Sequence, residues 1–321
     1  MLYVLSNYND PFWNLACEEY LLKNKNEDVF MLWRSKPCVI VGKHQNTYAE
    51  INYRFTRENN IKIARRLTGG GTVVHDMQNI NFTFIKNGAE GKLVDFNKFI
   101  SPIIEYLNTL GVAADIGGKN DICINGLKIS GNAEHVFRRR VLHHGTLLFD
   151  SDIIRLKETL NVKKGIYTDK AVQSNRSEVT NIRTHLKEQM SIEEFIEGLS
   201  KFILKNNSGS TEYSFTDKEI LNIEKLSSDK YSKEEWIFGY SPKYNLTREF
   251  IFSNKKWQID IHVVKGEITS AVVFINDEEQ KEVAIDLTGI KHLHRNIFKI
   301  FKHTQLLLSD SELEELPYYF F

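Results

Sequence analysis

Three consecutive glycines, Gly69–Gly71, stand between two short apolar segments, residues 61–64 and 72–75. The composition of both segments is typical of β-strands, so the glycines are expected to connect one strand to the next. Glycine lets the backbone approach a ligand closely and direct several N–H groups at one anion. Arg66 beside them could hold a phosphate or carboxylate with two parallel hydrogen bonds. A flexible strand connector has the same composition, and a P-loop is excluded because no Gly-Lys-Ser/Thr follows at the required spacing.

Several helices have recognisable ends. Asp10–Pro11 opens the first helix, because Asp caps a helix and Pro suits its first turn. Residues 96–110 have helical periodicity and end at Gly111, a C-terminal glycine cap. Ser191 and Thr216 each begin a capping box ahead of an apolar periodic segment. These signals predict helices spaced along the whole first part of the chain.

The expected strands lie between these helices. Two apolar runs, Val29–Trp33 and Cys38–Val41, are separated by a Ser-Lys-Pro break and are predicted to pair with each other. Residues 72–75 and 80–85 are predicted to form a hairpin, and Asn125–Gly126 is the strongest short hairpin signal in the sequence. The mixture predicts an α+β fold with mixed sheets and flanking helices.

A change of pattern near residues 236–242 predicts two domains. This segment combines turn formers with aromatic residues, and beyond it the chain alternates between apolar and polar residues again before a helical tail. We expect a large domain over residues 1–245 and a small α+β domain over residues 246–321.

Composition excludes several classes of protein. The chain has 42 Lys plus Arg and 42 Asp plus Glu among 321 residues, so no global positive field would attract nucleic acid or an anionic membrane. Cys17, Cys38 and Cys123 form no C-x-x-C pair, which argues against a disulfide framework or structural zinc. The first residues do not have a signal-peptide pattern, and no apolar run is long enough to span a bilayer. We expect a monomeric cytoplasmic protein with no nucleic-acid or membrane partner.

A second cluster of candidate residues surrounds the Asn125–Gly126 turn. A tight hairpin there places Lys128 close to Asp121 on the adjacent strand. The carboxylate could bind Mg²⁺ and the ammonium could neutralise a phosphate, although a solvated salt bridge is the commoner outcome for such a pair. By contrast, His143 and His144 are adjacent on a strand, so they point to opposite faces and cannot bind one metal together.

Several segments, in one order along the chain, resemble the successive motifs of bacterial lipoate–protein ligases. They are residues 14–19, 31–34, 64–76, 120–121, 128–131, 143–148, 176–181 and 236–242. The resemblance covers nearly the whole chain and departs from the family at Leu67, where relatives often have serine. It implies a catalytic domain of the type shared with biotin ligases and a C-terminal accessory domain used during adenylation.

The resemblance also assigns roles to particular residues. Lys128 is the expected catalytic lysine, contacting both the α-phosphate and the lipoyl carbonyl. The expected ATP- and adenylate-binding residues are Arg66, Gly71, Thr72, Val73, Val74 and Lys128. The expected lipoate-binding residues are Trp33, Arg66, Gly70, His75 and Lys128. Asp121 is the expected Mg²⁺ ligand.

The implied activity is the ATP-dependent conversion of lipoate to lipoyl-AMP, with release of pyrophosphate, followed by transfer of the lipoyl group to a lysine. The implied acceptors are the lipoyl domains of 2-oxoacid dehydrogenase E2 subunits and the glycine cleavage H protein. A cysteine acyltransferase of the same superfamily is disfavoured, because residues 109–116 contain no cysteine where those enzymes place their nucleophile. A biotin ligase is disfavoured because its Gly-Arg-Gly-Arg type of adenylate loop is absent. A non-catalytic lipoate-binding protein would not need Lys128, Asp121 and Arg66 together.

Overall fold

The computed structural model describes residues 1–88, 95–118, 121–162, 165–304, 306 and 308–321. The chain forms two compact units. The first contains residues 1–43, 61–157 and 174–233, and the second contains residues 44–60, 158–173 and 234–321. The expected division at 245/246 falls inside a β-strand, Tyr244–Phe252. The second unit begins earlier because residues near Ile237 pack within it, where the Ile237 carbonyl accepts a hydrogen bond from Thr47 Oγ1 at 2.7 Å.

The first unit is built on an eight-stranded mixed sheet with the order β12-β1-β2-β6-β10-β9-β8-β7. In that order the strands are Thr211–Glu212, Leu2–Leu5, Val29–Trp33, Asn79–Asn87, Arg140–Leu148, Leu127–Phe137, Asp121–Ile124 and Ala114–Gly117. β12, β1 and β2 are parallel to one another, and the remaining neighbours are antiparallel. The strongest hairpin prediction is confirmed, because Asn125 and Gly126 connect β8 to β9 with positive φ angles of 50° and 79°.

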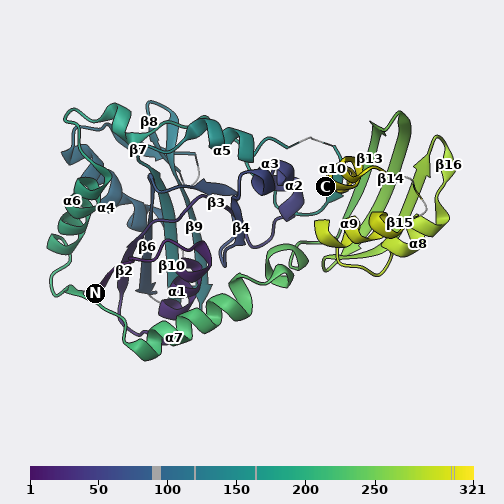
Figure 1. Ribbon diagram of the computed structural model, residues 1–321. Helices are drawn as coiled ribbons and strands as arrows, with labels where there is room; N and C mark the ends of the chain where they lie inside the picture. The colour runs from purple at the N-terminus through teal and green to yellow at the C-terminus, as the bar shows by residue number, and fades with distance from the viewer. Residues whose placement is uncertain (89–94, 119–120, 163–164, 305, 307) are drawn as a thin grey trace. The chain divides into compact units, whose positions relative to one another are not determined.

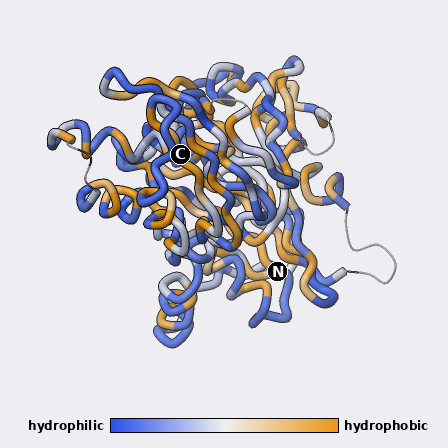
Figure 2. Tube along the Cα trace, turned by 90° about the vertical axis from the view of Figure 1, so that its right-hand side faces the viewer, coloured by the Kyte–Doolittle hydropathy of each residue, from blue (hydrophilic) through white to orange (hydrophobic). Residues whose placement is uncertain are grey.

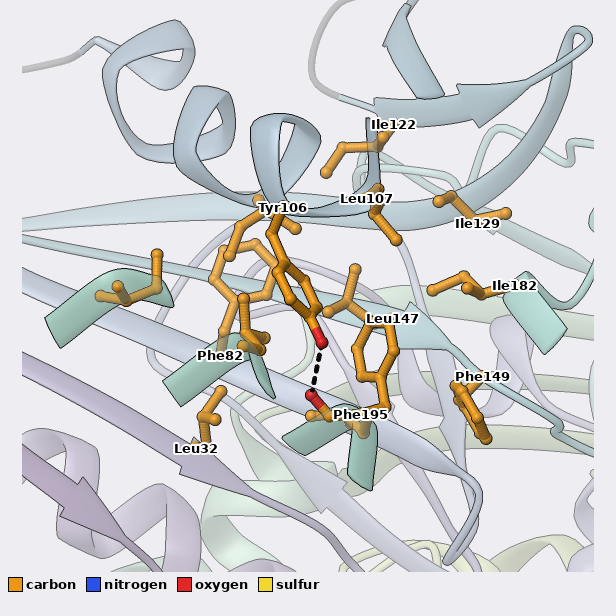
Figure 3. Packing of buried hydrophobic residues seen from close by; sticks show 14 of the residues in the cluster. Leu32, Phe82, Tyr106, Leu107, Ile122, Ile129, Leu147, Phe149, Ile182 and Phe195 are labelled. Carbon is orange, nitrogen blue, oxygen red and sulfur yellow. Dashed lines mark hydrogen bonds between the residues drawn. The ribbon is translucent and has the colours of Figure 1, made fainter. Parts of the chain in front are cut away.

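One face of this sheet forms the hydrophobic core. Helices α4 (Phe96–Thr109) and α6 (Ile192–Lys205) lie side by side against this face (Figure 1). The cluster includes Phe82, Leu147, Ile103, Leu107 and Phe195. In Figure 3, Tyr106 of α4 packs among these residues while its hydroxyl donates a hydrogen bond of 3.1 Å to the Phe195 carbonyl of α6. The hydrogen bond satisfies the one polar atom that Tyr106 brings into the core.

The opposite face of the same sheet, called the polar face below, carries small and polar residues beside apolar ones such as Met31. Residues that pair directly across strands share a face, and Thr83 pairs with His144, which pairs with Ala133. Helix α1 (Pro11–Asn24) packs against β4, β6 and β10, and its Glu18 reaches both Thr83 and His144 on this face. As predicted, α1 begins at Pro11, with Asp10 accepting hydrogen bonds from the backbone N–H groups of the first turn.

A small three-stranded sheet with the order β4-β3-β5 lies in the same unit. Its strands are Lys62–Arg65, Cys38–Val41 and Val73–His75. Two pairing predictions are therefore wrong. Val29–Trp33 (β2) pairs with β1 and β6 and not with Cys38–Val41, which pairs with β4 and β5. Residues 72–75 and 80–85 do not form a hairpin either, because β5 and β6 belong to different sheets and residues 76–78 carry the chain from one sheet to the other.

The wrong pairing of β2 with β3 has a physical reason. Every residue of β2 and of β3 is buried. Such strands show no alternation between apolar and polar residues, so their sequences contain no signal for which neighbour they pair with.

The second unit contains a five-stranded antiparallel sheet with the order β11-β13-β14-β15-β16. The strands are Tyr167–Asp169, Tyr244–Phe252, Lys255–Val264, Glu267–Ile275 and Glu278–Glu279. Its helices are α2 (Thr47–Glu50), α3 (Tyr53–Glu58), α8 (Lys281–Leu287), α9 (His294–His303) and α10 (Asp310–Glu315). The expected alternating strands and helical tail after residue 246 are present.

Helix ends follow their sequence signals closely. The capping boxes at Ser191 and Thr216 are both formed, at the starts of α6 and of α7 (Asp217–Leu226). Gly111 follows α4 with a φ of 75°, as a C-terminal cap requires. Helix α5 spans Ile153–Thr159. Hydrophobic and hydrophilic residues interleave along the helices (Figure 2), and none of the helices in the described ranges is long and apolar enough to cross a membrane.

Candidate active site

Arg66 binds the loop that contains Gly69, Gly70 and Gly71, called the glycine segment below. Its Nη2 group donates hydrogen bonds to the carbonyls of Gly69 at 2.6 Å and Gly71 at 2.7 Å, and its Nε donates to Thr68 Oγ1 at 2.8 Å. Burial lowers the pKa of Arg66 to about 10, so the guanidinium remains charged at neutral pH. The side chain therefore fixes the shape of the loop and places a positive charge beneath it.

Two of the three glycines are required by close approaches. Gly70 has a φ of 85°, and a Cβ atom there would lie 3.0 Å from Arg66 Nη2. A Cβ atom at Gly71 would lie 3.1 Å from Ser174 Oγ, which accepts a hydrogen bond from the Thr72 N–H at 2.8 Å. A Cβ atom at Gly69 would meet no described residue within 4 Å. The loop conformation depends on Gly70 and Gly71.

The glycine segment and the Lys128 hairpin meet on the polar face of the sheet. A Cβ atom on Gly70 would lie 3.8 Å from Cβ of Ala133, in β9. Gly131 is two residues earlier on the same strand and hence on the same face, and a Cβ atom there would lie 3.1 Å from Lys128 Nζ. The structure thus brings the two glycine-bearing segments, which are far apart in sequence, to one surface.

Lys128 and Asp121 form the expected pair. Lys128 Nζ lies 2.9 Å from Asp121 Oδ1, and each side chain is about a quarter exposed, at 25% and 27%. A third segment joins them, because the Lys128 N–H donates to the Glu178 carbonyl at 2.9 Å and the Lys128 carbonyl accepts from the Thr180 N–H at 3.1 Å. Lys128 therefore has a fixed backbone and an accessible ammonium group.

Trp33 and His75 lie together at the end of β2 and β5. Their rings meet edge to face, with centroids 5.7 Å apart, and both residues are buried. Within the part of the chain that is described, neither ring nitrogen of His75 has a hydrogen-bond partner. Burial, and then the charge of Arg66, lower the pKa of His75 to about 3, so the imidazole is neutral at physiological pH. The pair offers an apolar surface with two unused polar atoms.

Sequence reasoning missed a group of polar residues that links these parts. Glu18 accepts hydrogen bonds from Thr83 Oγ1 at 2.5 Å and from His144 Nδ1 at 3.0 Å. His144 Nε2 lies 2.8 Å from Thr68 Oγ1. The available signal was an acidic pair, Glu18-Glu19, in the middle of an otherwise apolar helical segment.

The geometry gives little support to a metal cluster or to a cysteine nucleophile. No group of three or more His, Cys, Asp or Glu residues within the described ranges could hold a metal ion. A magnesium ion would have Asp121 as its protein ligand, and Asn120 of the same motif lies outside the described residues. Burial raises the pKa of the Cys123 thiol, which disfavours the thiolate that an acyltransferase would need.

Comparison with known proteins decides the family. Residues 10–203 match the family model described as the lipoyl protein ligase A/B catalytic domain. Lipoate–protein ligase 1 of Staphylococcus aureus is 39% identical over 318 residues, which cover 96% of this chain and 93% of that protein. The chain belongs to the lipoate–protein ligase family.

Solved structures of lipoate–protein ligases agree with this assignment. P. falciparum LipL1 in complex with lipoate has a TM-score of 0.64 and 25% identity, covering 98% of both chains. Lipoate–protein ligase A bound with ATP has a TM-score of 0.65 and 25% identity, covering 74% of this chain and 98% of that chain. A bipartite lipoate–protein ligase from Thermoplasma acidophilum, studied with its E2 lipoyl domain, has a TM-score of 0.64 and 25% identity, covering 74% and 96%.

The predicted fold class and enzyme class are therefore confirmed. The chain is a lipoate–protein ligase by family and by fold, an enzyme that activates lipoate with ATP and transfers the lipoyl group to protein. The glycine segment approaches the polar face of the large sheet at Ala133, and Gly131 on the same strand lies against Lys128.

Proposed function

We propose that Lys128 is the residue on which both steps of the ligase reaction depend. The supporting observation is its position: Nζ lies against Gly131, on the strand whose Ala133 approaches Gly70, with Asp121 as a partner that solvent can reach. In the first step a lipoate oxygen attacks the α-phosphorus of ATP and pyrophosphate leaves. Both reactants are anions, so a fixed cation where negative charge accumulates lowers the barrier.

In the second step the same ammonium acts on a different oxygen. The acceptor lysine, as a neutral amine, attacks the lipoyl carbonyl carbon, the bond to the phosphate oxygen breaks, AMP leaves, and the amine loses a proton. Lys128 stabilises the carbonyl oxygen as it becomes an oxyanion, and no covalent bond to Lys128 forms. The rest of the rate enhancement comes from holding the two reactants together.

The nucleotide is bound by the glycine segment together with Arg66. Gly71, Thr72, Val73 and Val74 supply the backbone that faces the phosphates and the adenosine. Arg66 contributes through its buried charge and through its hold on the Gly69 and Gly71 carbonyls. The Thr72 N–H donates a hydrogen bond to Ser174 Oγ. For this N–H to donate to ATP instead, the bond to Ser174 would have to break.

Lipoate is bound by the apolar surface beside this segment. Trp33 and His75 pack edge to face there, and Gly70, Arg66 and Lys128 surround the carboxylate end. A neutral His75 with two unpartnered nitrogens can accept or donate one hydrogen bond to a ligand without placing a charge next to the acyl chain. Replacement of Trp33 should therefore alter which acids are accepted.

The described residues provide one carboxylate, that of Asp121, for a magnesium ion beside Lys128. Mg²⁺ is commonly held by one or two carboxylates together with substrate phosphates, and Asp121 provides one carboxylate beside Lys128. When bound, the ion would neutralise part of the charge of the triphosphate. If Asp121 holds it, Asp121→Asn should raise the Mg²⁺ concentration needed for half-maximal adenylation, and an unchanged requirement would exclude Asp121 as the ligand.

The acceptors are lipoyl domains of 2-oxoacid dehydrogenase E2 subunits and the glycine cleavage H protein. Support comes from the structurally similar T. acidophilum ligase, which was studied with its E2 lipoyl domain. We place the enzyme in the cytoplasm as a monomer, in keeping with its free cysteines. Residues 1–245 would carry the catalytic role and residues 246–321 the accessory role during adenylation.

A two-stage assay tests this function. The wild-type protein is incubated with lipoate and ATP labelled in the α-phosphate, and lipoyl-AMP and pyrophosphate are measured before an apo lipoyl domain is added. The expected result is pyrophosphate release that requires lipoate, followed by a mass increase of the acceptor by one lipoyl group. A domain whose target lysine is replaced by alanine should remain unmodified. Lipoate binding without pyrophosphate release would contradict the proposal and favour a non-catalytic binding protein.

A further inference from the structure

One branch of a buried hydrogen-bond chain runs from Glu18 to Trp33. Trp33 Nε1 donates to Thr83 Oγ1 at 3.1 Å, and the Thr83 hydroxyl donates to Glu18 Oε1 at 2.5 Å. The hydroxyl thus accepts at one lone pair and donates its only proton to the carboxylate. Trp33, at the acyl-binding surface, is therefore held in place by a carboxylate on a different element, helix α1.

A second branch runs from Glu18 to the glycine segment. His144 Nδ1 lies 3.0 and 3.1 Å from the two oxygens of Glu18, and His144 Nε2 lies 2.8 Å from Thr68 Oγ1. Thr68 Oγ1 in turn accepts from Arg66 Nε at 2.8 Å. Glu18 and Thr68 are 3% and 1% exposed, so no bulk water competes for these bonds.

The donors of both branches point toward the carboxylate. An ionised carboxyl group can only accept hydrogen bonds, so His144 must carry a proton on Nδ1. In a neutral imidazole Nε2 is then an acceptor, and the Thr68 hydroxyl must donate to it. That leaves the lone pairs of Thr68 Oγ1 for Arg66 Nε–H. The charge of Glu18 therefore determines the tautomer of His144 and the orientation of two hydroxyl groups.

We propose that Glu18 is a positioning residue of this ligase, which acts through His144 and Thr68 to hold Arg66 and the Gly69–Gly71 segment in the conformation needed for adenylation. Through Thr83 it also orients Trp33. The same carboxylate thus connects the acyl-binding surface to the nucleotide-binding segment. This inference rests on the proposed roles of Arg66 and Trp33, and Glu18 itself contacts neither reacting group.

An isosteric amide at Glu18 disrupts this arrangement at a predictable point. In Glu18→Gln one acceptor becomes an NH₂ donor, which must face either Thr83 or His144 Nδ1. At the Oε2 position it faces His144 Nδ1 at 3.1 Å, and for Nδ1 to accept a hydrogen bond from it the imidazole must move its proton to Nε2 and donate to Thr68. The Thr68 hydroxyl then has to turn to the Gly69 carbonyl, now 3.4 Å away, which already accepts from Arg66 Nη2 at 2.6 Å. The result is a displaced carbonyl in the glycine segment.

The test measures the two half-reactions of Glu18→Gln together with a structural signal. Loss of a hydrogen bond to a charged group corresponds to about a 10- to 100-fold effect. We expect lipoyl-AMP formation at saturating lipoate and ATP to slow by that factor. Transfer from preformed lipoyl-AMP should slow less, because aminolysis no longer needs the triphosphate to be held. The ¹H–¹⁵N indole signal of Trp33, assigned by its absence in Trp33→Phe, should shift.

Thr68→Val provides a second route, because it removes the hydroxyl while keeping the shape. Thr68→Val should slow adenylation by a factor similar to that of Glu18→Gln. Both residues belong to one chain of hydrogen bonds, so the double variant should be no slower than the slower of the two single variants. Additive losses would overturn the proposal. This variant also keeps the test decisive if Glu18→Gln does not fold.

The matched control is Glu19→Gln, on the same helix. Glu19 is equally buried but is bound by Lys23, Lys230 and Tyr231, outside the chain of bonds to Glu18. The Glu19→Gln variant should have a lower melting temperature. The ratio of its adenylation rate to its transfer rate, and the indole signal of Trp33, should be unchanged. If Glu18→Gln behaves like this control, Glu18 is only structural. If Lys128 proves dispensable, the proposed function fails, but the Trp33 signal still reports on Glu18 independently.

Discussion

The two faces of the eight-stranded sheet use the same strands for different purposes. His143 and His144 are neighbours on β10, yet they face opposite sides. His143 stacks on Phe99 at 4.8 Å in the hydrophobic core, whereas His144 joins Glu18 to Thr68 on the polar face. The core face consists of large apolar residues packed against α4 and α6. The polar face, around Thr83, His144 and Ala133, contains small or hydrogen-bonded residues next to the glycine segment.

The core face should mainly determine stability, and the polar face should mainly determine activity. Burial of apolar side chains is the main favourable contribution to folding, so variants on the core face should change the free energy of unfolding. Glu18, Thr83 and His144 on the polar face are hydrogen-bonded to one another, and Gly131 of the same face lies against Lys128, so variants there should change the reaction. For two residues adjacent in sequence, the comparison therefore predicts different outcomes. A variant on the core face should mainly lower the free energy of unfolding, and a variant on the polar face should mainly lower the reaction rate.

The largest effect on stability is expected for Phe82→Ala. Phe82 is fully buried in the core cluster, and such a truncation costs about 3–5 kcal/mol because of lost burial and the remaining cavity. Urea unfolding followed by circular dichroism measures it. At a temperature where the variant is folded, adenylation per folded molecule should be close to wild type. A stable variant with strongly reduced adenylation would contradict the separation of the faces.

A pair of glycine substitutions sharpens the comparison. A Cβ atom at Gly145, on the core face, would lie 2.4 Å from Phe82 Cζ and 2.1 Å from Asn132 Oδ1. Gly145→Ala should therefore cost about 1–3 kcal/mol or more through overpacking. Among the described residues, a Cβ atom at Gly131, on the polar face, meets only the flexible end of the Lys128 side chain, at 3.1 to 3.2 Å.

Gly131→Ala should accordingly keep its stability but displace the Lys128 ammonium and slow both half-reactions. Melting curves and the two-stage assay on both variants decide the matter. The separation of the faces fails if Gly131→Ala is the less stable of the two, or if it is as active as wild type.

Trp33→Val tests the acyl-binding surface. We expect a destabilisation of about 1–2 kcal/mol from the lost ring contact with His75 and hydrogen bond to Thr83. The freed volume should admit carboxylic acids bulkier than lipoate, which a panel of acids in the adenylation assay would show. If Trp33 is only a packing residue, the variant would lose stability and accept no new acid.

The smallest effect concerns pH. Burial lowers the pKa of His75 to about 3, from 6.5 in the unfolded chain. Below pH 6.5 the unfolded state therefore binds one more proton at this residue, so the contribution of His75 to stability is complete above that pH and is lost as the solution is acidified toward pH 3. At pH 5.5 His75 should account for a loss of about 1 kcal/mol.

Urea unfolding at pH 7.5 and pH 5.5 measures this loss, with His75→Phe as the comparison variant. The variant should lose about 1 kcal/mol less than wild type over the same interval. An identical loss in the two proteins would contradict the buried, neutral state of His75.

Local features of the fold could be predicted from sequence, and long-range ones could not. The Asp10 cap, the capping boxes at Ser191 and Thr216, and the Asn125–Gly126 hairpin are each specified within a few residues, so their signals are local. The partners of β2 and β3 are set by the packing of two sheets, about which fully buried strands carry no information. The network around Glu18 joins residues 65 to 126 positions apart, and single-sequence reasoning has no means of connecting them.

The site shows the same division. The closeness of Lys128 to Asp121 followed from one turn and is confirmed at 2.9 Å. Roles for Arg66, Trp33, His75 and Asp121 came from family resemblance and stay predictions about function. Arg66 is more deeply engaged than expected, because its donors already bind carbonyls of its own loop.

The most direct test of the polar face as the active site is Lys128→Ala in the two half-reactions. Removal of one preorganised donor to a developing negative charge typically slows a reaction by on the order of 10²–10³. We predict a loss of this size both in lipoyl-AMP formation from lipoate and ATP and in transfer from preformed lipoyl-AMP. The circular dichroism spectrum and melting temperature should stay close to wild type, because the side chain is partly exposed. A folded Lys128→Ala variant that lipoylates its acceptor at nearly the wild-type rate would contradict the account.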